Sequence, residues 1–105
     1  MIERLALWGP LAPGGAEHWL VRSIAGEWSE ATVSGWEYTI GFGPAAGQPG
    51  LTLDPDAPVI SVAVLTSDRL DRHWRDLDAH LGSGYRRVRA ETLSAWIHET
   101  DPTAE

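Results

Sequence analysis

Runs of apolar residues predict several short β-strands along this chain. Positions 2–8 are mostly apolar and end at a glycine–proline pair, which breaks regular structure. Positions 28–40 are rich in tryptophan, threonine, valine and isoleucine, residues that favour extended backbone. Positions 59–65 read Val-Ile-Ser-Val-Ala-Val-Leu, a run typical of a buried strand. We predict a strand at the first and third places, and one bent strand or a strand pair at the second.

Further apolar segments predict strand pairing. Residues 51–53 and 59–65 flank the turn sequence Asp-Pro-Asp-Ala-Pro at 54–58, which predicts a hairpin. Residues 85–93 and 95–98 predict a second, closing strand pair near the end of the chain. The total is five or six short strands.

Helical spacing of apolar residues occurs twice. Residues 16–25 bring three apolar positions onto one side and predict a short helix: Leu20, Val21 and Ile24. A second helix is predicted with Thr66 or Ser67 as its cap and Gly82 or Gly84 as its end. Its apolar stripe consists of Leu70, Trp74, Leu77 and Leu81.

These elements predict an α+β fold. Strands outnumber helices and lie on both sides of the main helix, which favours a small mixed β-barrel of five or six strands with two flanking helices. A chain of 105 residues is long enough for one hydrophobic core, so we expect a single domain over residues 1–105.

Composition excludes several classes of function. The net charge of −7 opposes a phosphate backbone, so we expect no nucleic-acid partner. Without cysteine there is no disulfide, thiol nucleophile or thiolate metal site, and the four histidines show no metal-ligand spacing, so we expect no metal. No apolar run approaches the roughly 18 residues of a membrane span, and the first residues do not resemble a secretory signal. A cytoplasmic protein without a membrane partner is the expectation.

Two stretches carry the strongest signal. Residues 5–15 read Leu-Ala-Leu-Trp-Gly-Pro-Leu-Ala-Pro-Gly-Gly, and residues 77–87 read Leu-Asp-Ala-His-Leu-Gly-Ser-Gly-Tyr-Arg-Arg. In order and spacing they resemble the two signatures of the gamma-glutamylcyclotransferase-like (AIG2-like) family, Tyr-Gly-Ser/Thr-Leu-x-Pro-Gly and Leu-Asp-x-x-Glu-Gly-x-x-Tyr-x-Arg. The resemblance implies a compact β-barrel with flanking helices and a reaction that needs no cofactor. In that reaction the α-amine of a γ-glutamyl amine closes onto its side-chain carbonyl, giving 5-oxoproline and a free amine.

The chain departs from the family where the chemistry takes place. Leu81 stands where the family has its catalytic glutamate, and it cannot transfer a proton. Pro10 lacks a backbone N–H, and Trp8 replaces a tyrosine. The resemblance therefore implies a pocket with no certain catalytic residue, whose candidate ligand-binding residues are Trp8, Gly9, Pro10, Leu11, Leu81 and Tyr85.

Whether the chain is an enzyme stays open at this point. One hypothesis is an inactive or small-ligand-binding family member, whose ligand is a γ-glutamyl amine or a more apolar compound. A second is an active or altered cyclotransferase with a displaced base; the candidates are His73, His80, His98 and Glu99. His80 is expected to face away from Leu81, because neighbouring helix residues point about 100° apart. A third is a structural or interaction protein whose pocket is filled. The oligomeric state is not predicted.

Overall fold

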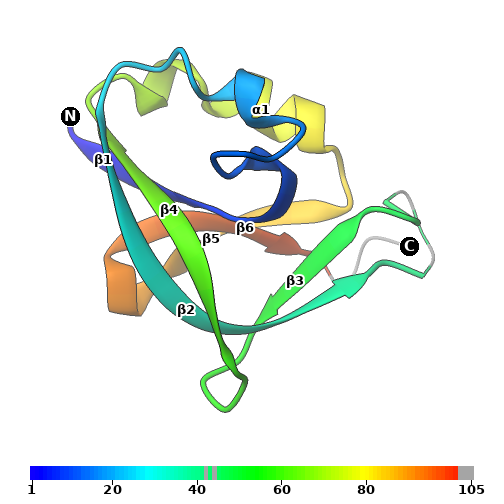
Figure 1. Ribbon diagram of the computed structural model, residues 1–105. Helices are drawn as coiled ribbons and strands as arrows, with labels where there is room; N and C mark the ends of the chain where they lie inside the picture. The colour runs from blue at the N-terminus through cyan, green and yellow to red at the C-terminus, as the bar shows by residue number, and fades with distance from the viewer. Residues whose placement is uncertain (42, 44, 102–105) are drawn as a thin grey trace.

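The computed structural model of the chain describes residues 1–41, 43 and 45–101. Six strands form one mixed sheet in the order β3-β2-β4-β1-β6-β5, with β1 and β6 parallel and the other neighbours antiparallel (Figure 1). The strands are β1 (Glu3–Leu7), β2 (Glu27–Thr39), β3 (Pro49–Leu53), β4 (Val59–Ser67), β5 (Tyr85–Ala90) and β6 (Ala95–Thr100). The predicted α+β class and mixed sheet are confirmed.

The sheet curls into a half-barrel, because β3 folds over toward β6 (Figure 1). The contact between them runs through side chains. The Leu51 N–H donates to Thr100 Oγ1 at 3.0 Å, and the Leu53 N–H donates to Glu99 Oε2 at 3.2 Å. A strand edge that is covered by side chains in this way has its backbone donors satisfied without a full ladder.

The hairpin predicted for residues 51–53 and 59–65 is wrong. β3 and β4 each pair with β2, and they lie on its opposite edges. At the crossing, Ser34 O accepts from the Asp54 N–H, while the next amide, the Gly35 N–H, donates to Pro58 O. The long bent strand β2 therefore pairs with both segments, and they do not form a hairpin with each other. The closing pair β5 and β6 is antiparallel as predicted, with a 3₁₀ turn over Glu91–Leu93 between them.

The described residues contain one α-helix, α1 (Trp74–Leu81), so the expectation of two flanking helices is corrected. The segment 16–25 forms only a 3₁₀ turn over His18–Leu20. A short helix is costly to nucleate, and its apolar residues Val21 and Ile24 are buried through turns instead. The main helix is also shorter than predicted, because a separate 3₁₀ turn (Leu70–Arg72) precedes it.

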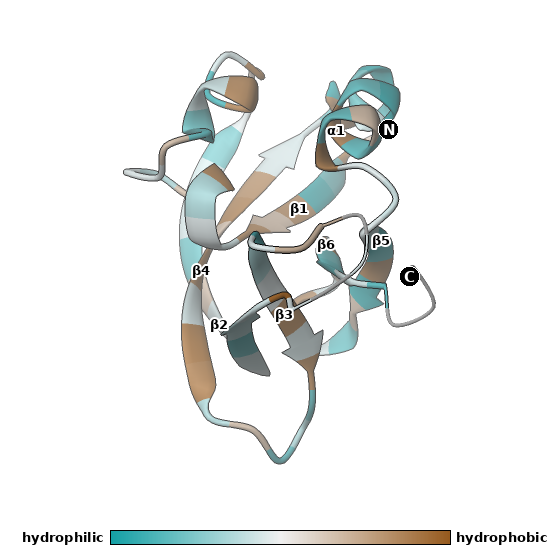
Figure 2. Ribbon diagram, turned by 90° about the vertical axis from the view of Figure 1, so that its right-hand side faces the viewer, coloured by the Kyte–Doolittle hydropathy of each residue, from teal (hydrophilic) through white to brown (hydrophobic). Residues whose placement is uncertain are grey.

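The strand β1 contributes to a hydrophobic core on each face of the sheet. Alternate residues of β1 point in opposite directions, so Leu5 and Leu7 join a leucine-rich core beneath α1. Ala6 and Trp8 join a second core inside the curled sheet. Figure 2 shows hydrophobic stretches along the strands on which these cores are built. The first β-strand thus ends between the two cores, and the chain turns there into the loop described next.

Candidate functional site

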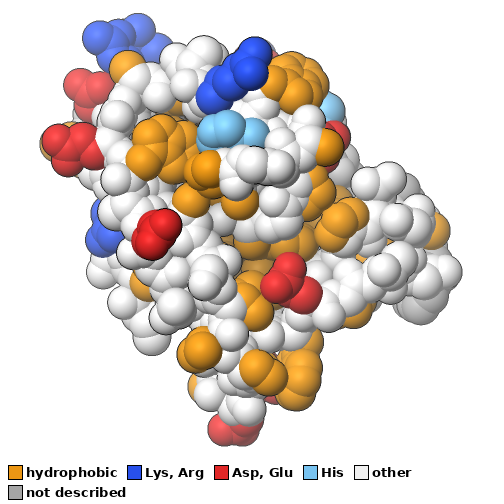
Figure 3. Space-filling model, viewed as in Figure 1, with side chains coloured by type: hydrophobic (Ala, Val, Ile, Leu, Met, Phe, Trp, Pro, Cys, Tyr) orange, Lys and Arg blue, Asp and Glu red, His pale blue; other side chains and the backbone are white. Residues whose placement is uncertain are grey.

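A cavity of about 310 Å³ lies where the loop after β1 meets the end of α1 and the start of β5. Hydrophobic side chains gather at the centre of the face seen in Figure 3. Five of the six predicted ligand-binding residues line the cavity, namely Trp8, Pro10, Leu11, Leu81 and Tyr85. Gly9 is an exposed turn residue and does not line it. The other lining residues are Ala6, Leu7, Glu17, Ala45, Gln48, Pro49, His80 and His98.

The loop after β1 brings Glu17 to this cavity. A 3₁₀ turn, η1 (Gly9–Leu11), follows β1, and Pro10 O then accepts a hydrogen bond from the Glu17 N–H at 2.9 Å. Gly15 is required for this fold of the loop, since a Cβ there would lie 2.2 Å from Pro10 O. The glycines of the opening motif therefore place a carboxylate that the sequence analysis did not single out.

The end of α1 supplies the opposite wall. Gly82 adopts a φ of 79° and its N–H donates to Asp78 O at 3.0 Å, which ends the helix directly after Leu81. Leu81 packs against the core beneath α1, as the predicted stripe requires, and it also lines the cavity. Leu81 is therefore both part of the apolar stripe and a lining residue, because the cavity stays open although this side chain is partly buried.

His80 lies at the same cavity, contrary to the expectation that it faces away. His80 Nε2 and Glu17 Oε1 are 3.0 Å apart, and both side chains are about one third exposed. The ring of Trp19 packs edge-on against the His80 ring, with centroids 5.8 Å apart. The cavity surrounds the helix terminus, so two successive residues reach it in spite of the angle between them.

A second histidine of the cavity wall, His98, is also paired with a carboxylate, that of Asp78, which is not among the described lining residues. His98 is buried on β6, and its Nε2 lies 2.9 Å from Asp78 Oδ1, while Arg87 Nη1 lies 3.2 Å from Asp78 Oδ2. Burial lowers the pKa of His98, and this outweighs the opposing effect of the Asp78 hydrogen bond. His98 is therefore neutral near pH 7. Its carbonyl accepts from Trp8 Nε1 at 2.6 Å, which fixes the indole beside the cavity.

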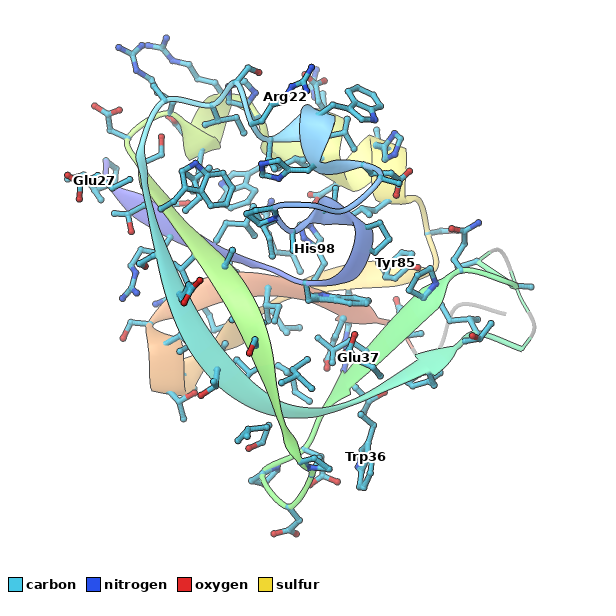
Figure 4. The ribbon with its side chains drawn as sticks, viewed as in Figure 1. Arg22, Glu27, Trp36, Glu37, Tyr85 and His98 are labelled. Carbon is cyan, nitrogen blue, oxygen red and sulfur yellow. The ribbon has the colours of Figure 1, made fainter. Side chains whose placement is uncertain are left out.

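Tyr85 closes the side of the cavity next to β3. In Figure 4, Tyr85 and His98 lie beside the loop that follows β1. The Tyr85 hydroxyl donates to Pro49 O at 2.5 Å, and its ring centroid lies 6.5 Å from that of Trp8. Burial raises the pKa of Tyr85, and the charge of Glu17 raises it further. The phenol therefore stays neutral at physiological pH, and its proton is already committed to a backbone carbonyl.

The two other candidate bases lie outside the cavity lining. His73 precedes α1, and its carbonyl accepts the Leu77 N–H at 3.0 Å. Glu99 is buried and is held by Arg86, whose Nη2 lies 2.8 Å from Glu99 Oε1. Across residues 1–41, 43 and 45–101, no three His, Asp or Glu side chains gather as a metal ion would require.

Comparisons with protein-family models, with curated proteins and with solved structures give no match to this chain. Within the part of the chain that the structure describes, no helix has the length and apolar character needed to cross a membrane. The function must therefore be inferred from the cavity and its residues.

Proposed function

We propose that this chain binds a small organic ligand in the cavity between η1 and the end of α1, as a gamma-glutamylcyclotransferase-like protein without the family's catalytic glutamate. The observation that carries the proposal is the cavity itself, which remains open at about 310 Å³ beside Leu81. Ligand sites in proteins span about 300–1,000 Å³, so the volume suits a small molecule. This open space favours ligand binding over the alternative of a structural protein with a filled pocket.

The character of the lining supports the same function. Most lining residues are apolar or aromatic, and a few polar groups converge among them: Glu17, Gln48, His80, Tyr85 and His98. Small-molecule sites combine an apolar surface for affinity with a few placed polar groups for orientation. Trp8 and Leu81 add apolar area where the family sequence has tyrosine and glutamate, which favours a ligand less polar than a γ-glutamyl zwitterion.

A second candidate function, an altered cyclotransferase, is favoured by one specific observation. Glu17 and His80, 3.0 Å apart, line the same cavity as Leu81. In such a reaction the substrate's α-amine nitrogen attacks its side-chain carbonyl carbon, and Glu17 accepts the proton from that nitrogen. The proton then passes to the leaving amine as the original C–N bond breaks. His80 orients the carboxylate, so this base would act from the loop rather than from position 81.

The test is 5-oxoproline release from a panel of γ-glutamyl amines by the purified chain, beside Leu81→Glu and Glu17→Gln. The binding proposal expects no turnover by the unmodified chain. It also expects turnover by Leu81→Glu, because restored acid–base catalysis is typically worth about 10² to 10⁴ in rate. Turnover by the unmodified chain that Glu17→Gln abolishes would establish the second candidate instead.

If neither the unmodified chain nor any variant releases 5-oxoproline, binding is measured directly. The Trp8 indole N–H donates to His98 O at the cavity wall, so the NMR signal of this N–H should shift when a ligand enters. Trp36 is half exposed at the far end of the molecule and serves as an internal control (Figure 4). If no compound of the panel, and no smaller apolar analogue, shifts the Trp8 signal, the proposal is wrong.

A further inference from the structure

We propose that the cavity selects organic ammonium ions, with Glu17 supplying the charge that discriminates them from neutral and anionic compounds. The inference rests on the proposed ligand-binding function and adds the chemical class of the ligand. It follows from the charge of the lining, from the aromatic wall and from the volume of the cavity.

The lining carries a single kind of charge. Among the thirteen described residues around the cavity, Glu17 is the one carboxylate, and none is a lysine or arginine. His98 is neutral near pH 7, because its burial lowers its pKa. Among the described lining residues, His80 is the side chain that contacts Glu17, with 3.0 Å between His80 Nε2 and Glu17 Oε1. With one carboxylate and no lysine or arginine, these lining residues favour a cation over a carboxylate or phosphate.

Glu17 has capacity for a second donor. Its Oε1 atom accepts from His80, and an ionised carboxylate offers about four lone-pair positions on two oxygens. The side chain is 38% exposed, so an entering ammonium group need not displace His80 to reach it. Contact with a charged donor gives a stronger hydrogen bond than contact with a neutral hydroxyl.

The aromatic wall has no donor left for an anion. Trp8 Nε1 is bound to His98 O, and the Tyr85 hydroxyl is bound to Pro49 O. The two rings, tilted by 52° to each other, therefore contribute apolar surface and π electrons rather than N–H or O–H groups. Aromatic rings attract cations within about 6 Å, and aromatic side chains recognise quaternary ammonium ligands in this way.

The volume limits the size of the cation. A water molecule occupies about 30 Å³, so a cavity of about 310 Å³ holds on the order of ten non-hydrogen atoms. Leu11, Pro10 and Leu81 offer apolar contacts for the body of such a molecule. A primary ammonium group on a short apolar or aromatic body fits this description, and phenylethylammonium is a suitable probe.

The test compares three probes of matched shape and different charge. The full chain is titrated with phenylethylammonium, phenylethanol and phenylacetate, and binding is followed by the NMR signal of the Trp8 indole N–H. We expect the ammonium ion to bind roughly fivefold or more tighter than the alcohol, from the combined contributions of a partly exposed ion pair and a cation–π contact. Phenylacetate should bind weakest.

Matched variants assign the selectivity to Glu17. Glu17→Gln keeps the shape of the side chain and removes its charge, so the preference for ammonium over alcohol should disappear. Glu30→Gln removes a charge from the exposed surface of β2, away from the cavity lining, and should leave the preference intact. Loss of preference in both variants would overturn the assignment to Glu17, because it would indicate an effect of net charge alone.

The possible failures can be told apart. Equal binding of ammonium and alcohol would overturn the ammonium selectivity and leave the ligand-binding function standing. Tighter binding of phenylacetate would overturn it as well, since the lining would then act as an anion site. If none of the three probes shifts the Trp8 signal, the inference fails; the proposed function fails with it only when the γ-glutamyl amines and smaller apolar analogues are silent too.

Discussion

Two histidines that line the cavity are each paired with a carboxylate at nearly the same distance, but in different surroundings. In the wall, His98 and Asp78 are 2.9 Å apart, and the His98 side chain is only 5% exposed. At the mouth, His80 and Glu17 are 3.0 Å apart, and the His80 side chain is 34% exposed. The residue types and the distances barely differ, so the surroundings must account for any difference in role.

Burial gives His98 a structural role, whereas the more exposed pair of His80 and Glu17 remains available to a ligand. In the wall, the low pKa of His98 keeps it neutral. Its ring bonds to Asp78 and its carbonyl to Trp8, so both groups are engaged within the protein. The buried His98 ring is satisfied by the half-exposed Asp78 carboxylate, and removing that carboxylate would leave a buried ring nitrogen unsatisfied, which is costly. The mouth pair is screened by solvent, so it adds little to stability and its carboxylate can take up a ligand. The following predictions test this division.

The largest expected effect separates two leucines of α1. Leu77→Ala removes a side chain that is 2% exposed in the core beneath the helix and should lower the free energy of unfolding by about 2–5 kcal/mol. Leu81→Ala borders the open cavity, so water or neighbours can occupy the space, and the loss should be less than half as large. Urea denaturation measures both. Equal losses would show that the cavity is closed in solution.

A smaller effect separates the two histidines. His98→Ala deletes a buried ring and leaves Asp78 with one partner fewer, so the free energy of unfolding should fall by about 1–3 kcal/mol. His80→Ala should change it by less than about 0.5 kcal/mol, as is usual for an exposed position. The comparison fails if His80→Ala is the more destabilising of the two in the same urea series.

The smallest effect is a dependence on pH. The pKa of folded His98 lies below its ordinary value of 6.5, so the unfolded chain binds a proton more readily. The stability contributed by this group is fully present above the ordinary pKa and is lost as the pH falls from there through the folded pKa. Between about pH 7 and about pH 5, the unmodified chain should therefore lose more stability than His98→Ala. Parallel curves for the two proteins would contradict a buried, neutral His98.

The positions of the strands were easier to predict from the sequence than the way in which the strands pair. The runs at 2–8, 28–40 and 59–65 correspond to the strands Glu3–Leu7, Glu27–Thr39 and Val59–Ser67, since extended propensity and apolar runs are local properties. The pairing of β3 with β2 instead of β4 was not predictable. It depends on the length and bend of β2, which offers both of its edges to segments that are neighbours in sequence.

The candidate site divides in the same way. The motif residues Trp8, Pro10, Leu11, Leu81 and Tyr85 meet at one cavity, and their positions could be named from sequence patterns. Glu17 lacked any such signal, because it follows the glycine motif without belonging to it. Its place depends on the close approach of Gly15 to Pro10, a contact that only the folded loop contains.

The sequence by itself determined the class of fold, the apolar stripe of α1 and the absence of cysteine chemistry, because each follows from residue type and local spacing. Tertiary structure alone decided which strands pair, that His80 reaches the cavity, and that Glu17 stands across from it. Those features depend on contacts between residues far apart in the chain. The difference between a buried histidine and an exposed one likewise exists only after the sheet has curled around its core.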